Sequence, residues 1–293
     1  MSTLFIWLQY CLPQHLLSRI VGALAHARQP RWLVTWVIRR FVAHYDVNLA
    51  EAQGTDAADY PSFNAFFTRP LKPGARPVAD ADLVCPADGV VSQCGAIHGD
   101  RVFQAKGRHF SLDELLGGDS ARSSVFRDGA FATIYLSPRD YHRVHMPMAG
   151  RLTATCYVPG RLFSVNAVTA EGVDRLFARN ERLVCYFEGP RGPFAMVLVG
   201  AMIVAGIETV WSGQVAPPPR RVMTLDYAAL PAPISLERGD EMGRFLLAST
   251  VILLFPPGAP VFNAALTPSA SARIGDAMGA YDGAYDASSD PIM

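Results

Sequence analysis

The sequence predicts an α+β protein in which a single β-rich core follows N-terminal amphipathic helices. Three observations support this class. Apolar residues recur at helical spacing over the first 45 positions. From Val84 onward, alternating or continuous apolar runs of strand length replace the helical period. Hydrophobic residues make up 50% of the 293-residue chain, which is long enough to bury a sizeable core.

Two amphipathic helices are predicted at the N-terminus. One wide apolar stripe extends from Leu4 to Leu24. Pro13 is expected to kink or divide this helix, because proline cannot donate the backbone hydrogen bond that a helix needs. A second helix is predicted over residues 32–45, with aliphatic and aromatic side chains, including Trp36, on one side.

Positive charge is concentrated in the same segment. The formal net charge of the chain is zero, yet residues 1–45 hold five arginines and no acidic residue. Basic amphipathic helices with Trp and Phe suit the headgroup boundary of an anionic bilayer. We therefore expect residues 1–60 to dock on a membrane, with packing of both stripes on the protein's own core as the alternative. No apolar run reaches the roughly 20 residues that a bilayer crossing needs, so the attachment should be peripheral.

A β-rich core is predicted over residues 61–267, beginning with a short helix around residues 63–67. The chain after Pro268 is rich in Ser, Ala, Gly and Asp, so residues 268–293 are expected to form a flexible tail without a catalytic role. Apolar patterns of strand type predict core strands over residues 129–136, 152–158, 194–207 and 245–255.

The five cysteines predict neither a disulfide framework nor a zinc site. Their number is odd, and no two of them form a CxxC pair. The sequence ALA at residues 23–25 imitates a signal-peptidase site. However, polar residues interrupt the apolar stretch before it, and no lysine or arginine stands in front of that stretch. We therefore expect no cleaved signal peptide and a reducing, cytoplasmic setting.

One serine stands in an apolar, strand-like segment close to the C-terminus, where the sequence GRFLLAST at residues 243–250 contains Ser249. Two further segments hold what a reactive serine needs. CPADG at residues 85–89 supplies an acid, and RDYHRVHMP at residues 139–147 supplies two histidines. Taken alone, a serine in an apolar strand is more often a packed hydroxyl, and an Asp-Gly pair is more often a turn.

These segments resemble the phosphatidylserine decarboxylases, pyruvoyl enzymes that make their own cofactor from an internal serine. The resemblance extends over nearly the whole chain and is closest to the bacterial membrane-associated branch. Besides the three segments above, it depends on FNAFFTRPL at residues 63–71, QAKG at 104–107, YVPG at 157–160, LFARNER at 176–182 and GDEMGRF at 239–245.

The resemblance implies a self-cleavage in which Ser249 attacks the carbonyl of Ala248. An N-to-O acyl shift would give an ester, β-elimination would release the N-terminal fragment, and Ser249 would become a pyruvoyl group. The resemblance assigns His145 as the base and Asp88 as the residue that orients it. The pyruvoyl ketone would then form a Schiff base with phosphatidylserine, CO2 would leave, and His142 would return a proton.

The resemblance also implies the product and the partners. Phosphatidylethanolamine would be made at the cytoplasmic face of the membrane, on an anionic surface. The two fragments of the cleaved zymogen should stay associated, and a homodimer is expected. No nucleic-acid partner is predicted. His142 and His145 lack a further His or Cys at a supporting spacing, so no metal is predicted either.

Ala248 departs from the family pattern, which has Leu-Gly-Ser-Thr where this chain has Leu-Ala-Ser-Thr. If the backbone there needs a positive φ, the added Cβ costs roughly 1 to 2 kcal/mol, which would slow self-cleavage about 5- to 30-fold. Two alternatives follow. One is a non-catalytic, membrane-binding member of the family arrested by Ala248, and the other is a Ser-His-Asp hydrolase, although no G-x-S-x-G elbow surrounds Ser249.

Overall fold

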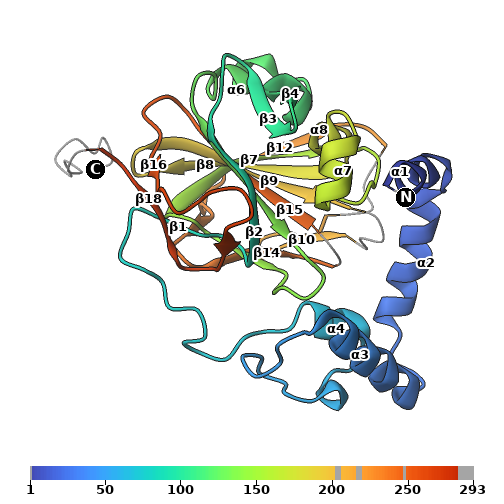
Figure 1. Ribbon diagram of the computed structural model, residues 1–293. Coiled ribbons are helices and arrows are strands. Elements are labelled where there is room, and N and C mark those ends of the chain that lie inside the picture. Colours follow the sequence, from blue (N-terminus) through green and yellow to red (C-terminus); the bar gives the residue numbers. More distant parts are fainter. Residues whose placement is uncertain (1, 202–205, 216–219, 247–248, 283–293) are drawn as a thin grey trace.

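A nine-stranded antiparallel sheet organises the computed structural model, which describes residues 2–201, 206–215, 220–246 and 249–282 (Figure 1). Its strands are β2 (Gly89–Ala96), β5 (Ala130–Leu136), β7 (Gly150–Val158), β8 (Arg182–Gly189), β9 (Gly192–Gly200), β12 (Met223–Asp226), β13 (Ser235–Leu236), β15 (Ser249–Phe255) and β17 (Ser271–Ala272). They follow the order β12-β7-β8-β9-β15-β5-β2-β17, and β13 pairs with β7.

Three smaller sheets accompany the large one among the described residues. The first has the order β11 (Gly213–Gln214), β10 (Ile207–Thr209), β14 (Glu241–Phe245), β6 (Arg143–His145). The second has the order β1 (Leu83–Val84), β18 (Ala277–Ala280), β16 (Val261–Phe262). The third is the hairpin of β3 (Arg101–Ala105) and β4 (Arg108–Ser111).

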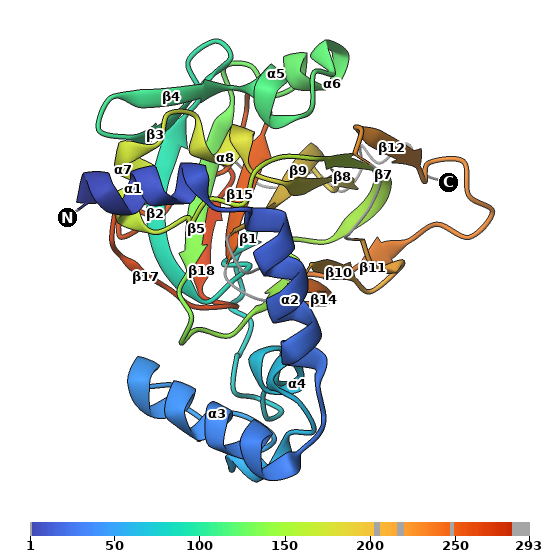
Figure 2. The same cartoon turned by 90° about the vertical axis from the view of Figure 1, so that its right-hand side faces the viewer.

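The longer helices precede all of these strands, as predicted. Both views place the long helix α3 and the short helix α4 together below the large sheet, while α1 and α2 lie along its flank (Figures 1 and 2). The predicted α+β class with a β-rich core is confirmed. The helices are α1 (Ser2–Cys11), α2 (Gln14–His26), α3 (Arg31–Tyr45), α4 (Phe63–Phe67), α5 (Leu112–Leu115), α6 (Ser120–Ser124), α7 (Ala167–Gly172) and α8 (Leu176–Arg179), with a 3-10 turn at Ala57–Asp59.

β15 is the most deeply buried strand of the large sheet, because apolar residues occupy both of its faces. Val251, Leu253 and Phe255 pack into one hydrophobic core. Ile252 and Leu254 pack into a second core on the other face. A strand that is covered on both sides needs a continuous apolar run, which the sequence here supplies.

Two predicted strands are each divided in the structure, and this corrects the sequence interpretation. The run predicted over residues 194–207 is β9 and β10, which belong to different sheets. The run predicted over residues 245–255 also belongs to two strands, because β14 ends at Phe245 and β15 begins at Ser249. Both halves of each run are buried in apolar surroundings, so hydrophobicity alone does not reveal the point where the chain passes from one sheet to another.

The tail predicted from residue 268 is ordered up to Ala280, which corrects that prediction for these residues. β17 pairs with β2, and β18 lies between β1 and β16. The small residues that suggested a tail allow strands to approach closely: a Cβ at Gly279 would lie 2.7 Å from the Val261 carbonyl oxygen. Met278 and Ile274 are fully buried. Residues 283–293 lie outside the described part of the chain.

Pro13 separates α1 from α2, as predicted, and α2 presents its small and polar side to the core. Its buried residues are Gln14, Ser18, Gly22 and Ala25. The apolar stripe faces outward instead: Leu24 is 68% exposed, and Leu16 and Ile20 are also exposed. These side chains therefore do not pack on the protein's own core.

Polar contacts from α1 and α2 attach these two helices to the loop after β7. The Gln14 side-chain oxygen accepts a hydrogen bond from the backbone N–H of Leu162 (2.8 Å), and the Gln9 oxygen accepts one from Ser164 (2.8 Å). No helix in the described part of the chain has the length and the apolar character needed to span a bilayer.

Candidate active site

Ser249 is the first residue of β15 and not the centre of a continuous strand. It lies between Leu136 of β5 and Gly200 of β9, its Cα partners in the sheet. Its side chain is fully buried, and its Oγ has no hydrogen-bond partner among the described residues. A buried hydroxyl without a partner is costly to the fold, so its presence at a strand end favours a chemical role.

His145 ends the short strand β6 and is held in one tautomer. Its Nδ1 lies 2.7 Å from the backbone oxygen of Gly239. Because a carbonyl oxygen only accepts hydrogen bonds, Nδ1 carries the proton and Nε2 keeps a free lone pair. Nε2 lies 3.5 Å from the Tyr141 hydroxyl. Burial lowers the pKa of His145, and nearby Glu241 opposes this shift, so the ring is a neutral base at neutral pH.

Asp88 lies just before β2, and its carboxylate is held by Arg76. The guanidinium Nε donates to both carboxylate oxygens at 3.1 Å, and the Ile274 N–H donates to Oδ1 at 2.9 Å. No hydrogen bond joins Asp88 to His145 in the described part of the chain, because the ring N–H already donates to Gly239. The two segments are nevertheless adjacent, since the His145 N–H donates to the Pro86 oxygen at 2.8 Å.

His142 is fully buried against an aromatic ring. Its imidazole centroid lies 4.0 Å from that of Phe67. Its Nδ1 donates to the Asp140 backbone oxygen (2.8 Å), whereas Nε2 has no partner among the described residues. Burial lowers the pKa of His142 to about 3. The ring is therefore neutral at neutral pH, with a free lone pair on Nε2.

Strand pairing brings these three segments to one place. The N–H of Phe245, the last residue of β14, donates to the His142 oxygen (2.9 Å). Leu136, the sheet partner of Ser249, is the last residue of β5 and begins the loop that leads to His142. The Ser249 hydroxyl is not hydrogen-bonded to either histidine in the described structure. Ala248, on the other side of the predicted cut, lies outside the described residues.

Comparison with known proteins identifies the family. A family model described as phosphatidylserine decarboxylase matches residues 63–280, and a second, described as PSD, matches residues 4–46. The chain belongs to the phosphatidylserine decarboxylase family. It is 58% identical over 281 residues to the phosphatidylserine decarboxylase proenzyme of Alcanivorax borkumensis, an alignment that covers 95% of this chain and 96% of the relative. It is 56% identical over 278 residues to the proenzyme of Pseudomonas aeruginosa strain LESB58, covering 94% of this chain and 96% of the relative.

Several residues around the candidate active site of this decarboxylase were not predicted from the sequence. Arg76 binds Asp88, yet its position in the sequence follows no recognisable pattern. Arg143 forms an ion pair with Glu241 at 2.6 Å, which links β6 to β14. Tyr141 directly precedes His142 in the RDYHRVHMP segment, so a closer reading of that motif could have found it.

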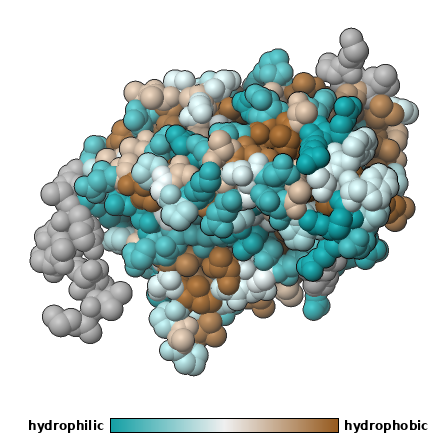
Figure 3. Space-filling model, turned by 90° about the horizontal axis from the view of Figure 1, so that it is seen from below, coloured by the Kyte–Doolittle hydropathy of each residue, from teal (hydrophilic) through white to brown (hydrophobic). Residues whose placement is uncertain are grey.

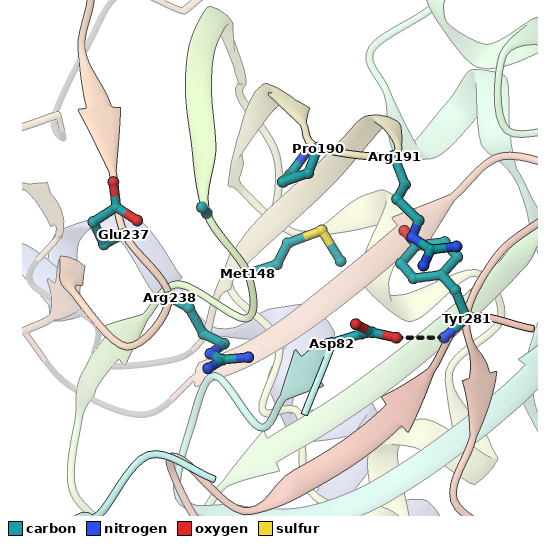
Figure 4. Close-up of a pocket in the computed structure, with 8 residues that line it drawn as sticks. Asp82, Met148, Pro190, Arg191, Glu237, Arg238 and Tyr281 are labelled. Atoms are coloured by element: carbon teal, nitrogen blue, oxygen red, sulfur yellow. Dashed lines mark hydrogen bonds between the residues drawn. The ribbon is translucent and has the colours of Figure 1, made fainter. Parts of the chain in front are cut away.

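Two pockets of this protein differ in whether predicted catalytic residues line them. A surface pocket of about 470 Å3 is lined by Met148, Arg191 and Tyr281, with the Arg191 guanidinium 4.8 Å from the Tyr281 ring (Figure 4). None of the four predicted catalytic residues lines it. A smaller and more polar pocket of about 250 Å3 is lined by Asp88 and Tyr141. The smaller pocket is therefore the one next to the predicted chemistry.

Proposed function

We propose that this chain is a self-processing, pyruvoyl-dependent decarboxylase that converts phosphatidylserine to phosphatidylethanolamine and CO2. The observation that supports this most strongly is the buried Ser249 hydroxyl, which has no partner at the start of a central strand. The family membership supplies the reaction class, because the curated relatives are named phosphatidylserine decarboxylase proenzymes.

Self-cleavage begins when His145 Nε2 takes the proton of the Ser249 hydroxyl. The Gly239 carbonyl fixes the tautomer that leaves Nε2 free to do so. Ser249 Oγ then bonds to the carbonyl carbon of Ala248, and the peptide C–N bond breaks as the departing nitrogen takes the proton back from His145, which gives an ester. Elimination removes the Cα proton of Ser249 and breaks its Cβ–Oγ bond, which frees the new carboxyl terminus and leaves a dehydroalanine. Water hydrolyses the imine form of that residue, and ammonia leaves to give the ketone. Asp88 contributes a nearby negative charge that favours the imidazolium.

The described surroundings of Ser249 suit a pyruvoyl group, because its sheet partner Leu136 belongs to the apolar core and no described residue donates a hydrogen bond to the hydroxyl. That group supplies an electron sink for the loss of CO2 from the substrate. His142 moves the proton. Its Nδ1–H donates to the Asp140 oxygen and its Nε2 has no partner among the described residues, so Nε2 is the atom that would carry the proton returned to the carbon that has lost CO2. Because an imidazolium is unstable in this buried position, it gives the proton back readily.

Cleavage would leave the two fragments tightly joined. β15 would begin the C-terminal fragment, while both of its sheet neighbours, β5 and β9, belong to the N-terminal one. A homodimer stays a prediction from the resemblance.

The first experiment is the intact mass of the purified protein under denaturing conditions, together with CO2 release from phosphatidylserine vesicles. We expect two fragments divided between Ala248 and Ser249, the smaller blocked by a pyruvoyl group. Ser249→Ala should stay one chain without activity, whereas Ser271→Ala, at an exposed serine of the same fragment, should be cut like the wild type. An uncut wild-type chain with no CO2 release would refute the proposal.

We also propose peripheral docking on the cytoplasmic, anionic face of the membrane through α1 to α3. Exposed apolar side chains support this, among them Leu24 (68%), Trp32 (71%) and Trp36 (56%). Viewed from below, the face that carries α3 and α4 has clusters of hydrophobic residues between polar ones (Figure 3). Arginines such as Arg19 and Arg40 are exposed on the same helices.

Co-sedimentation with anionic vesicles tests the docking surface. Replacing Trp32 and Trp36 together by Ser should weaken binding at least tenfold, because each tryptophan loses buried apolar area in the interface. The control is Val261→Ser, which removes an equally exposed apolar side chain from β16. Equal binding by both variants would refute the assignment.

A further inference from the structure

The pocket beside the predicted catalytic residues contains a buried cation, Arg69, that forms no ion pair with any described residue. The pocket measures about 250 Å3 and is lined by Arg69, Arg76, Asp88 and Tyr141, among other residues. Tyr141 connects it to the site, since its hydroxyl lies 3.5 Å from His145 Nε2. Arg69 differs from the other charged residues of the pocket because it is only 3% exposed and forms no ion pair in the described part of the chain.

Arg69 uses only one of its nitrogens. Nη2 donates to the backbone oxygens of Arg139 (3.1 Å) and Asp140 (3.4 Å), and the guanidinium lies over the Phe66 ring at 5.4 Å. Nε and Nη1 are buried and have no hydrogen-bond partner among the described residues. Burial lowers the pKa of Arg69, as expected for a cation that has lost water and gained little in return.

The two carboxylates whose charges act on Arg69, those of Asp88 and Asp140, are already engaged elsewhere. Asp88 accepts hydrogen bonds from Arg76 and from the Ile274 N–H. Asp140 accepts two from Ser137, through its N–H and its hydroxyl, both at 2.7 Å. The spare donors of Arg69 are therefore available to an anion that enters the pocket.

We propose that Arg69 binds the phosphodiester of the lipid headgroup in this pocket. This inference depends on the proposed decarboxylation of phosphatidylserine, whose headgroup carries two anions. A guanidinium bound to the carboxylate would stabilise the negative charge of the substrate, which is lost as CO2 leaves. Because the transition state keeps less of that charge, the contact would raise the barrier to decarboxylation. A guanidinium on the phosphodiester would stabilise the bound substrate and the transition state by the same free energy. Such a contact strengthens binding and leaves the barrier to CO2 loss unchanged.

The position of the pocket fits a lipid bound at a membrane surface. Its lining includes Asp46, the residue directly after α3, and the nearby Asn48. α3 carries the exposed Trp32 and Trp36. A lipid whose acyl chains remain beside that helix therefore brings its phosphate, the group next to the chains, to the mouth of the pocket.

The test is calorimetric binding of glycerophosphoethanolamine to the uncut Ser249→Ala chain. This protein has the continuous backbone of the structure, needs no catalysis and offers no ketone to the amine of the probe. Arg69→Met should weaken binding about ten- to hundredfold, the range expected for charge-assisted hydrogen bonds. Arg69→Lys should restore part of the affinity. The control Arg139→Met, at a pocket arginine whose side chain is 63% exposed, should leave binding nearly unchanged.

Other outcomes overturn the inference. Equal affinity of wild-type Arg69 and Arg69→Met would show that this arginine does not bind the phosphodiester. Inorganic phosphate that binds as tightly, with the same dependence on Arg69, would mean a general anion site and no headgroup site. If L-serine lost affinity in Arg69→Met while glycerophosphoethanolamine did not, Arg69 would bind the carboxylate. Failure of the proposed function is recognised separately, as an uncut chain with the wild-type Ser249.

Arg69→Met could also lose its fold, so each variant is first checked by its unfolding midpoint. In the cleavage-competent background, the KM for phosphatidylserine should rise about ten- to hundredfold with kcat nearly unchanged, and Arg69→Lys should again recover part of the loss. A fall in kcat with unchanged KM would indicate a purely structural role in holding the backbone before His142 and would overturn the proposal.

Discussion

Acid should destabilise the protein through His142, and the size of this effect follows from its burial. The structure lowers the pKa of this imidazole from its ordinary value of 6.5 to about 3. Because the folded pKa lies below the unfolded one, the contribution to stability is fully present above pH 6.5 and is lost as the pH falls from 6.5 towards 3. At pH 5 the free energy of unfolding should be about 2 kcal/mol lower than at pH 8 through this group alone.

The assay is urea unfolding of the uncut Ser249→Ala chain at pH 8 and pH 5, with and without His142→Gln. Glutamine does not titrate, so the variant should lose about 2 kcal/mol less between the two pH values. His145 and the carboxylates contribute equally to both proteins and cancel. His98→Gln, at an exposed histidine, is the control and should keep the full pH dependence. An identical pH dependence with and without His142→Gln would refute the reasoning.

Three further predictions concern maturation and packing. Ala248→Gly should shorten the half-time of self-cleavage about 5- to 30-fold, followed by intact mass, and an unchanged half-time would exclude a positive φ at this position. Arg76→Met leaves the nearly buried Asp88 carboxylate without its partner, so the free energy of unfolding in urea should fall by about 3 to 5 kcal/mol; a loss below 1 kcal/mol would contradict this. Phe67→Ala should lower the free energy of unfolding in urea by about 3 to 5 kcal/mol, because the Phe67 side chain is fully buried. The conservative Phe67→Leu should retain most of that free energy.

The local features of the fold were predictable because local chemistry determines them. Pro13 separates two helices, since a proline inside a helix removes a hydrogen bond. The short helix at Phe63–Phe67 begins where Ser62 accepts a hydrogen bond from the Ala65 N–H (3.1 Å). Alternating residues likewise identified β5 and β7 to within two residues of their bounds.

Features that depend on distant partners were not predictable. The division between β14 and β15 is set by membership of two sheets, which hydrophobicity does not record. The C-terminal strands β17 and β18 pair with β2 and β1, which lie far away in the sequence. The partner of the His145 ring was missed for the same reason, because a backbone oxygen such as that of Gly239 has no side chain to mark it.

The two histidines of the candidate site are held alike but have different surroundings, and this difference supports the separate roles proposed for them. Each donates its Nδ1–H to a backbone oxygen. Nε2 of His142 has no partner among the described residues, whereas Nε2 of His145 lies 3.5 Å from the Tyr141 hydroxyl. Around His145 lie Glu241 and Asp88, whose negative charges favour an imidazolium and suit a base that must keep a proton while Ser249 attacks. Around His142 lies the Phe67 ring, and full burial leaves a proton on Nε2 poorly stabilised. Such an imidazole releases a proton from Nε2 easily, which suits the proposed role of His142 as the proton donor to the carbon that has lost CO2.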